Sequence, residues 1–309
     1  MFNPIKMDLY RMFRMKSLYI IWIVLAAAIL FSTYLSWELS KYEPEASQES
    51  SYTQEMPQET GDGETEGNSV ALGMDIVLPT QPGEEITLFD QIYANLQGKF
   101  VALFLLIFTV LFSAADINSG YIKNIGGQVR DRSGLILSRA AALFVFTFLT
   151  MALNLIVQMI CQRLFFGKLL WGDAAQFWTY MGVQTVLHYA LVLIGMALAV
   201  ILKSNVISMT LCVCLTMNLL VIIYSAIDKV LEKLGADGFH LIEHTVTGKI
   251  DLFPMEAGVK ESLLAVGTAV VFGTLAAALT CGVFRRRDVK GQISGKRKDD
   301  LRHLHQLVP

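Results

Sequence analysis

Long apolar runs, separated by polar segments, constrain this chain more than any other feature. Each run holds roughly 20 residues, and a helix of that length crosses the ~30 Å hydrocarbon layer of a bilayer once. Lipid offers no partners to backbone N–H and C=O groups, so helices that satisfy these groups internally are expected. The sequence therefore predicts an all-α integral membrane protein with six transmembrane helices, at residues 17–37, 99–115, 139–161, 177–202, 206–227 and 262–284.

Composition agrees with a chain that lies in lipid. Hydrophobic residues make up 54% of the sequence and charged residues 17%, against about a quarter charged in a typical soluble domain. These proportions exclude an ordinary soluble domain. The formal net charge of -2 carries little information about partners, whereas the sign of charge along the chain carries much more.

The distribution of lysine and arginine predicts which side of the membrane each loop faces, because loops rich in these residues stay in the cytoplasm. The asymmetry predicts that both termini are inside. The residues expected inside are Lys6, Arg11, Arg14, Lys16, Lys123, Arg130, Arg132, Arg139, Lys203, Arg285, Arg286, Arg287, Lys290, Lys296, Arg297, Lys298 and Arg302; those expected outside are Lys41, Lys99, Arg163, Lys168, Lys229, Lys233, Lys249 and Lys260.

The N-terminal segment, residues 1–16, predicts an amphipathic elbow helix on the inner membrane surface. Asn3 followed by Pro4 suits a cap and a first helical position. At 100° per residue the apolar side chains share one face, and the basic ones lie off it. A solvated basic leader is the alternative. The residues on the apolar face are Phe2, Ile5, Leu9, Met12 and Phe13, and the basic ones are Lys6, Arg11 and Arg14.

Two outer segments are expected, at residues 38–98 and 228–261. The first begins with a stretch rich in Glu, Gln, Ser, Thr, Pro and Gly, a composition that predicts disorder. Apolar residues are frequent again from Val70 to Gln97, which predicts local packing over the outer end of the helix bundle. The acidic excess of this loop suits electrostatic capture of a cationic ligand, with a simple solvated loop as the alternative.

Two basic segments are expected in the cytoplasm. In the insert at 116–138, Tyr121, Ile125 and Val129 recur at four-residue spacing, which puts them on one face of a short helix that can dock onto a soluble partner. The tail at 285–309 predicts an anchor on anionic lipid, or else a partner contact.

Polar side chains inside the apolar runs are candidate functional residues, because unsatisfied amides are costly in hydrocarbon and should face the bundle interior. They predict a substrate path in the outer half of the membrane, or else hydrogen bonds between helices. The candidates are Asn154, Gln158 and Gln162 on one helix face, Gln184 and His188 on another, and Asn218.

The last run has a small residue at every fourth position, which allows close approach of another helix. That helix belongs to this chain or to a second subunit. The small residues are Ala265, Ala269, Gly273, Ala277 and Cys281.

No motif for covalent chemistry is found. The sequence has no G-K-[ST] triplet, HExxH or G-x-S-x-G, and no pair of acidic residues inside a run. The cysteines Cys161, Cys212, Cys214 and Cys281 fall within or at the ends of runs and read as packing residues. We expect no catalytic residue and no metal site.

The amphipathic leader, the six crossings with both ends inside and the basic insert together resemble the ABC-2 type ABC transporter permeases, over nearly the whole chain. In that family the insert often begins with an acidic residue, then a glycine and a lysine, and re-enters the membrane near Ser-Arg. The same order occurs here in Asp116, Gly120, Lys123, Ser138 and Arg139, with aspartate where glutamate is commoner.

This resemblance implies a permease subunit that pairs with a second permease subunit, as a homodimer or heterodimer, and is driven by separate cytoplasmic ABC ATPase subunits. No cofactor is bound directly, since the partner ATPase uses ATP and Mg. The elbow helix would make a second contact with that ATPase. The residues that would carry coupling are Asp116, Gly120, Tyr121, Lys123, Ile125 and Val129.

Small permeases of this shape occur in bacterial export and immunity against antimicrobial peptides such as lantibiotics. The acidic outer loop suits a cationic peptide, so export of a hydrophobic or cationic peptide or drug-like substrate across the bacterial cytoplasmic membrane is the expected function. Two alternatives stay open: a membrane-bound sensor or scaffold with an acidic receptor loop, and an intramembrane enzyme, for which no suitable catalytic pair exists.

Overall fold

The computed structural model describes residues 2–41, 78–80, 84–118, 133–233 and 240–305. All regular structure in these ranges is helical. Four helices are long and apolar enough to cross a membrane: α2 (Lys16–Ser40), α6 (Ser133–Phe166), α7 (Ala174–Leu202) and α11 (Val259–His305). The chain is therefore an all-helical protein suited to several membrane crossings.

Two further candidate spans are bent. Helices α3 (Leu88–Gln97) and α4 (Phe100–Asn118) meet at 51°, and helices α8 (Asn205–Thr216) and α9 (Leu220–Lys233) meet at 67°. If each bent pair counts as one span, the total reaches six, the number that the sequence predicts. The remaining elements in the described ranges are short: α1 (Phe2–Arg14), the 3-10 helix η1 (Leu241–His244) and α10 (Val246–Leu252).

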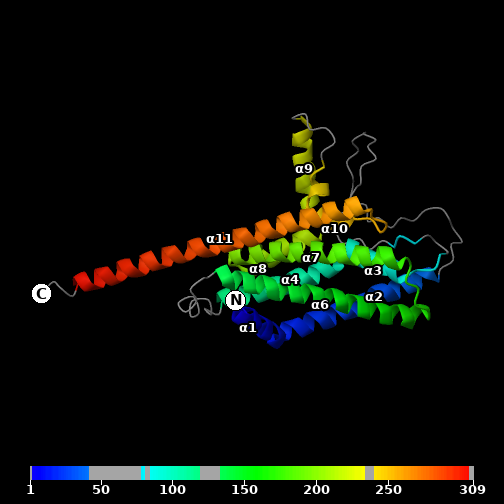
Figure 1. The fold of residues 1–309 in the computed structure, drawn as a ribbon, viewed down its shortest axis with the longest axis horizontal. Coiled ribbons are helices and arrows are strands. Elements are labelled where there is room, and N and C mark those ends of the chain that lie inside the picture. Colours follow the sequence, from blue (N-terminus) through cyan, green and yellow to red (C-terminus); the bar gives the residue numbers. More distant parts are fainter. Residues whose placement is uncertain (1, 42–77, 81–83, 119–132, 234–239, 306–309) are drawn as a thin grey trace.

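The long helices lie side by side, and α1 and the C-terminal part of α11 are at the same end of the bundle (Figure 1). Apolar side chains cover much of the outer surface, among them Ile23, Phe148, Ile160 and Leu279, each more than half exposed. A soluble protein of this size rarely exposes so much continuous apolar surface, whereas lipid covers it at no cost.

Helix α7 is the centre of the bundle. An added Cβ at its Gly195 would lie 2.5 Å from Leu106 Cδ2 of α4, so α4 approaches α7 closely there. Helix α11 packs along α7 on another side: a Cβ at Gly273 would lie 3.3 Å from Leu193 Cδ1 and 3.7 Å from Ala190 Cα. Ala265 and Ala269 are buried on the same side of α11, and Ala277 is partly buried. The stripe of small residues in the last run thus packs against a helix of the same chain.

The structure differs from the sequence prediction in two segments. Residues 88–97, expected in the outer loop, form α3, whose Leu88, Ile92 and Leu96 are fully buried in the bundle. A capping box between Thr87 and Asp90 starts this helix. The second difference is in the fifth run, expected as one helix at 206–227, which is interrupted between Thr216 and Leu220.

Both breaks occur at residues with left-handed backbone. Lys99, between α3 and α4, and Asn218, between α8 and α9, each have φ of 56°. A non-glycine residue in this region interrupts the helical hydrogen-bond ladder and costs free energy. The neighbouring structure must therefore hold these residues in place.

Candidate functional site

A buried cluster of charged and polar side chains occupies the place where both bends meet. Lys99 Nζ donates to Asp251 Oδ2 at 2.6 Å and also to Asn218 Oδ1. The Lys99 side chain is only 1% exposed. The cluster therefore ties the α3–α4 break, the α8–α9 break and α10 together.

Helix α10 is held in position from two further sides. Gln97 Nε2 donates to the Asp251 carbonyl oxygen at 2.9 Å, and Gln184 Nε2 donates to the Ile250 carbonyl oxygen at 3.2 Å. Because the last turn of a helix leaves carbonyls without intrahelical partners, these two amides satisfy groups that would otherwise be orphaned. Asp251 is thereby presented to Lys99 by α3 and α7 together.

Lys99 and Asp251 stabilise each other's charge at this buried position. Burial raises the pKa of Asp251 to about 6, and the Lys99 ammonium opposes that rise. Since a buried charge without a counter-charge is strongly destabilising, the pair acts as one unit. Charged groups within a membrane bundle mark functional sites more often than chance would give.

Next to the ion pair, α7 presents two buried hydrogen-bond acceptors. The His188 Nδ1 atom lies 2.8 Å from the Gln184 carbonyl oxygen, so Nδ1 carries the proton and Nε2 of the neutral ring is an acceptor. His188 Nε2 and Gln184 Oε1 have no partner among the described residues. Both are fully buried. Such atoms favour water or a donor group of a bound molecule.

A second cluster, made of uncharged amides and hydroxyls, lies between α2, α3 and α6. Gln158 Nε2 donates to Thr33 Oγ1 at 3.1 Å, and Asn95 Nδ2 donates to Gln158 Oε1 at 3.2 Å. One turn from Gln158, Asn154 is fully buried, and neither atom of its amide has a partner among the described residues. One turn further along α6 from Gln158, Gln162 Nε2 donates to the Ile86 carbonyl oxygen at 2.7 Å.

The polar residues singled out from the sequence are thus divided between two clusters. Asn154 and Gln158 belong to the amide cluster, whereas Gln184, His188 and Asn218 surround the ion pair. Helix α3 contributes to both, through Asn95 and through Gln97. Both clusters therefore include side chains of α3. The candidate residues form two separate groups and do not line one continuous path.

Sequence reasoning did not single out Lys99, which it put at the outer end of the second crossing, or Asp251, which it put in the outer segment 228–261. A signal was present: Phe100 follows Lys99, and Ile250 and Leu252 lie on both sides of Asp251. A charge with such neighbours is a candidate for burial, and burial of one charge calls for another.

The end of the bundle where α1 lies contains a third set of polar contacts, between α1, α4 and α6. Ser138 Oγ donates to Asp8 Oδ2 at 2.5 Å, and Arg139 Nη1 donates to the Ser113 carbonyl oxygen at 3.3 Å. Asp8 and Arg139 are both buried, and the Arg11 guanidinium lies 5.5 Å from the centre of the Phe112 ring. We call this set the elbow junction; it fixes α1 onto the start of α6 and the end of α4.

The coupling residues expected from the resemblance fall mostly outside the described residues. Gly120, Tyr121, Lys123, Ile125 and Val129 lie in 119–132, and Asp116 is in α4 with its side chain outside the description. Their role stays a prediction. Within the described ranges, no three His, Cys, Asp or Glu side chains come together as a metal site would require.

Comparison with known proteins does not assign this chain to a family. No protein-family model matches the chain, and no curated protein is significantly similar to it.

Proposed function

We propose that this chain is the membrane-spanning permease subunit of an ATP-driven transporter of the ABC-2 type, in a bacterial cytoplasmic membrane. Separate cytoplasmic ABC ATPase subunits would bind and hydrolyse ATP. The permease would supply the path and the mechanical linkage, so no covalent chemistry by its own side chains is required.

The observation that carries this proposal is the elbow junction. Ser138 and Arg139 are the residues at which the resemblance puts membrane re-entry, and their side chains contact Asp8 of α1 and Ser113 of α4. These contacts flank the insert at 116–138 on both sides. A push on the insert would therefore be transmitted to α1, α4 and α6 as one block, because buried polar contacts resist separation.

The two buried clusters are the proposed moving and selective parts. Helix α4 begins next to the Lys99–Asp251–Asn218 cluster and α8 ends next to it, so a shift of either helix changes the bends that this cluster holds. The unpartnered acceptors of Gln184 and His188, with the free amide of Asn154, would offer hydrogen bonds to a substrate in transit. Alternating access would proceed by rearrangement of these contacts.

For the substrate we propose a hydrophobic or cationic peptide or a drug-like molecule. The acceptor character of Gln184 Oε1 and His188 Nε2 suits ammonium and amide N–H donors. The acidic segment at 42–87 would concentrate cations near the outer end of the bundle. Deletion of residues 43–68 should then lower resistance of cells to a cationic peptide without lowering the membrane level of the protein; unchanged resistance would remove the electrostatic part.

The central test is an affinity pull-down of the detergent-solubilised protein from its native host. The Ile125→Asp variant puts a charge on the apolar face of the proposed coupling helix, and Asn124→Asp puts the same charge off that face. We expect an ABC ATPase subunit with the native chain and with Asn124→Asp, and its loss with Ile125→Asp at equal expression. Absence of an ATPase from all three would favour the sensor or scaffold function instead.

A further inference from the structure

Helices α7 and α11 leave a groove between their first turns. Its volume is about 340 Å³, which is within the range of pockets that hold small molecules, from roughly 300 Å³ upward. Both helices and the turn before α11 contribute side chains to it. We call it the α7–α11 groove, and six of its lining residues are Ala175, Gln176, Thr179, Ser262, Leu263 and Val266.

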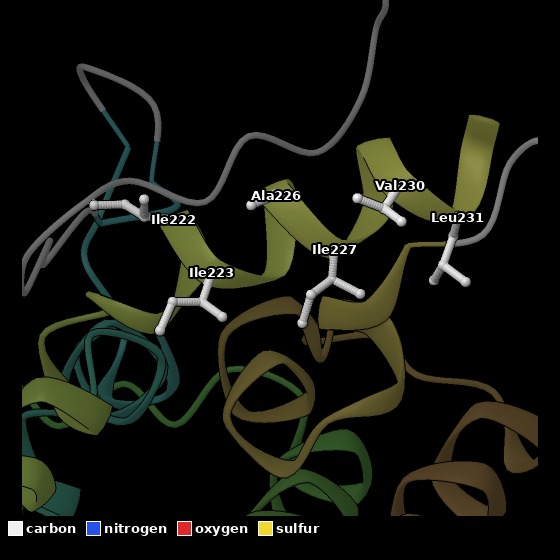
Figure 2. A pocket seen from close by; sticks show the side chains of 6 residues that line it. All are labelled: Ile222, Ile223, Ala226, Ile227, Val230 and Leu231. Carbon is white, nitrogen blue, oxygen red and sulfur yellow. The ribbon is translucent and has the colours of Figure 1, made fainter. Parts of the chain in front are cut away.

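The α7–α11 groove has a mixed lining. Apolar side chains such as Leu263 and Val266 lie beside the polar side chains of Gln176, Thr179 and Ser262. A larger groove on α9, of about 470 Å³, is lined only by apolar side chains of that one helix (Figure 2), so it does not specify a ligand. The mixed lining between α7 and α11, in contrast, selects a molecule that has an apolar and a polar part.

Ser262 presents an unused hydroxyl to this groove. Its Oγ atom is buried and has no hydrogen-bond partner among the described residues, whereas the Thr179 hydroxyl donates to the Ala175 carbonyl oxygen at 3.0 Å. A buried hydroxyl without a partner costs free energy, and an oxygen atom of a bound molecule would remove that cost. Ser262 is also in the first turn of α11, where the helix N-terminus favours an anionic oxygen such as that of a phosphate.

The bilayer supplies a molecule of this kind beside the groove. Helices α7 and α11 are both candidate membrane spans, so their first turns lie close to a membrane surface, where lipid headgroups begin. The lining residues Val259 and Leu263 are 79% and 67% exposed, as expected of side chains that contact acyl chains. A phospholipid would lay an acyl chain along Leu263 and Val266 and bring its phosphate to Ser262.

Charge around the groove selects the headgroup. Three exposed acidic residues are next to it in the chain: Asp173 directly precedes α7, and Glu256 and Glu261 directly precede lining residues. Lys260, also exposed, offsets only one of these charges. Surroundings with a net negative charge repel a lipid of net negative charge and attract an ammonium group.

We propose that the α7–α11 groove binds one phospholipid whose headgroup carries an amine, with the phosphate at Ser262 and the ammonium near Glu256 and Glu261. The bound lipid would bridge the first turns of the two helices. This site is separate from the buried clusters and from the elbow junction. Its test measures lipid binding and not transport, so it succeeds or fails independently of ATPase recruitment.

The test is native mass spectrometry of the delipidated full chain in detergent, titrated with phosphatidylethanolamine or with phosphatidylglycerol, which is anionic and has no amine. We expect one molecule of phosphatidylethanolamine to bind about 2–5-fold more tightly than phosphatidylglycerol, the range of exposed charge pairs. Ala175→Phe, which fills the groove, should abolish this binding. Ala174→Phe is the matched control, since Ala174 is exposed but does not line the groove, and it should bind like the native chain.

Two further variants test the polar contacts. Ser262→Ala should weaken binding of phosphatidylethanolamine about 2–10-fold through loss of one hydrogen bond. Glu256→Gln combined with Glu261→Gln should remove the preference over phosphatidylglycerol, whereas Glu232→Gln on α9 should keep it. Equal binding of the two lipids by the native chain would overturn the proposal, and so would unchanged binding by Ala175→Phe or an equal loss in Ala174→Phe.

Discussion

Lys99 and Asn218, separated by 119 residues in the chain, have the same left-handed backbone conformation and are joined to each other by a side-chain hydrogen bond. Asp251 bonds to Lys99 and so draws α10 into the same contact. Lys99 interrupts the α3–α4 span, and Asn218 interrupts the α8–α9 span. The two bends are therefore not independent, since one buried cluster holds both in place.

The first prediction concerns this ion pair. Asp251→Asn or Lys99→Met alone should destabilise the fold by about 3–5 kcal/mol, because each leaves a buried charge without its partner. The double variant should cost clearly less than the sum of the two single changes. Unfolding of the purified protein in detergent, followed by tryptophan fluorescence, would measure all four corners of this cycle. Additive losses would show that the pair contributes nothing as a pair.

A second prediction addresses the seat of α10. A Cβ at Gly248 would lie 1.9 Å from the Ile242 carbonyl oxygen, a backbone atom that cannot move without displacing η1. Gly248→Ala should therefore cost about 1–3 kcal/mol and disturb the position of Asp251. Gly258→Ala is the matched control, since nothing lies within 4 Å of its added Cβ. Equal unfolding midpoints for the two variants would contradict the packing described for α10.

The contact between α11 and α7 gives a third prediction. Gly273→Leu would force a branched side chain toward Leu193 and Ala190 and should cost about 1–3 kcal/mol. Gly267→Leu, on the same helix but exposed with nothing within 4 Å, should change stability by less than about 0.5 kcal/mol. Unfolding in detergent, followed by tryptophan fluorescence, would compare the stability of the two variants. Similar losses of stability in Gly273→Leu and Gly267→Leu would argue against close packing at Gly273.

The fourth prediction tests the elbow junction. Asp8→Ala removes the acceptor of the Ser138 hydroxyl and a negative charge that attracts the buried Arg139. We expect α1 to detach, with a loss of about 3–5 kcal/mol, and faster cleavage by trypsin after Arg11 or Arg14. Lys6→Ala, at an exposed position of the same helix, should leave the cleavage rate unchanged. If Asp8→Ala is cleaved no faster than the native chain, the junction does not hold α1.

Many of the long helices could be predicted from the sequence, because an apolar run of about 20 residues is the length that a helix needs to cross a bilayer. Both ends of α2 and α7, and the start of α8, lie within a few residues of the predicted boundaries. The helix at the N-terminus also forms, and its Met12 is fully buried while Tyr10 on the other side is exposed. Its place on a membrane surface stays a prediction, as do the sides assigned to the loops.

The two bends could not be predicted in this way. Hydropathy continues through Met217, Asn218 and Leu219 without a glycine or proline, and the left-handed conformation of Asn218 depends on its partner Lys99, far away in the chain. The ion pair was missed for the same reason. Their apolar neighbours Phe100, Ile250 and Leu252 make burial of each charge plausible, but only tertiary contacts reveal that Lys99 and Asp251 are buried against each other.

The large sequence separation within the Lys99–Asp251 pair also has a consequence for biosynthesis. The two residues are 152 positions apart, so at 5–20 residues per second Lys99 leaves the ribosome on the order of 10–30 s before Asp251 does. During that interval Asp251, the carboxylate that contacts Lys99 in the folded chain, has not yet been made. We therefore expect the α3–α4 bend to reach its final packing only after α10 has been synthesised, so that this contact forms late in folding.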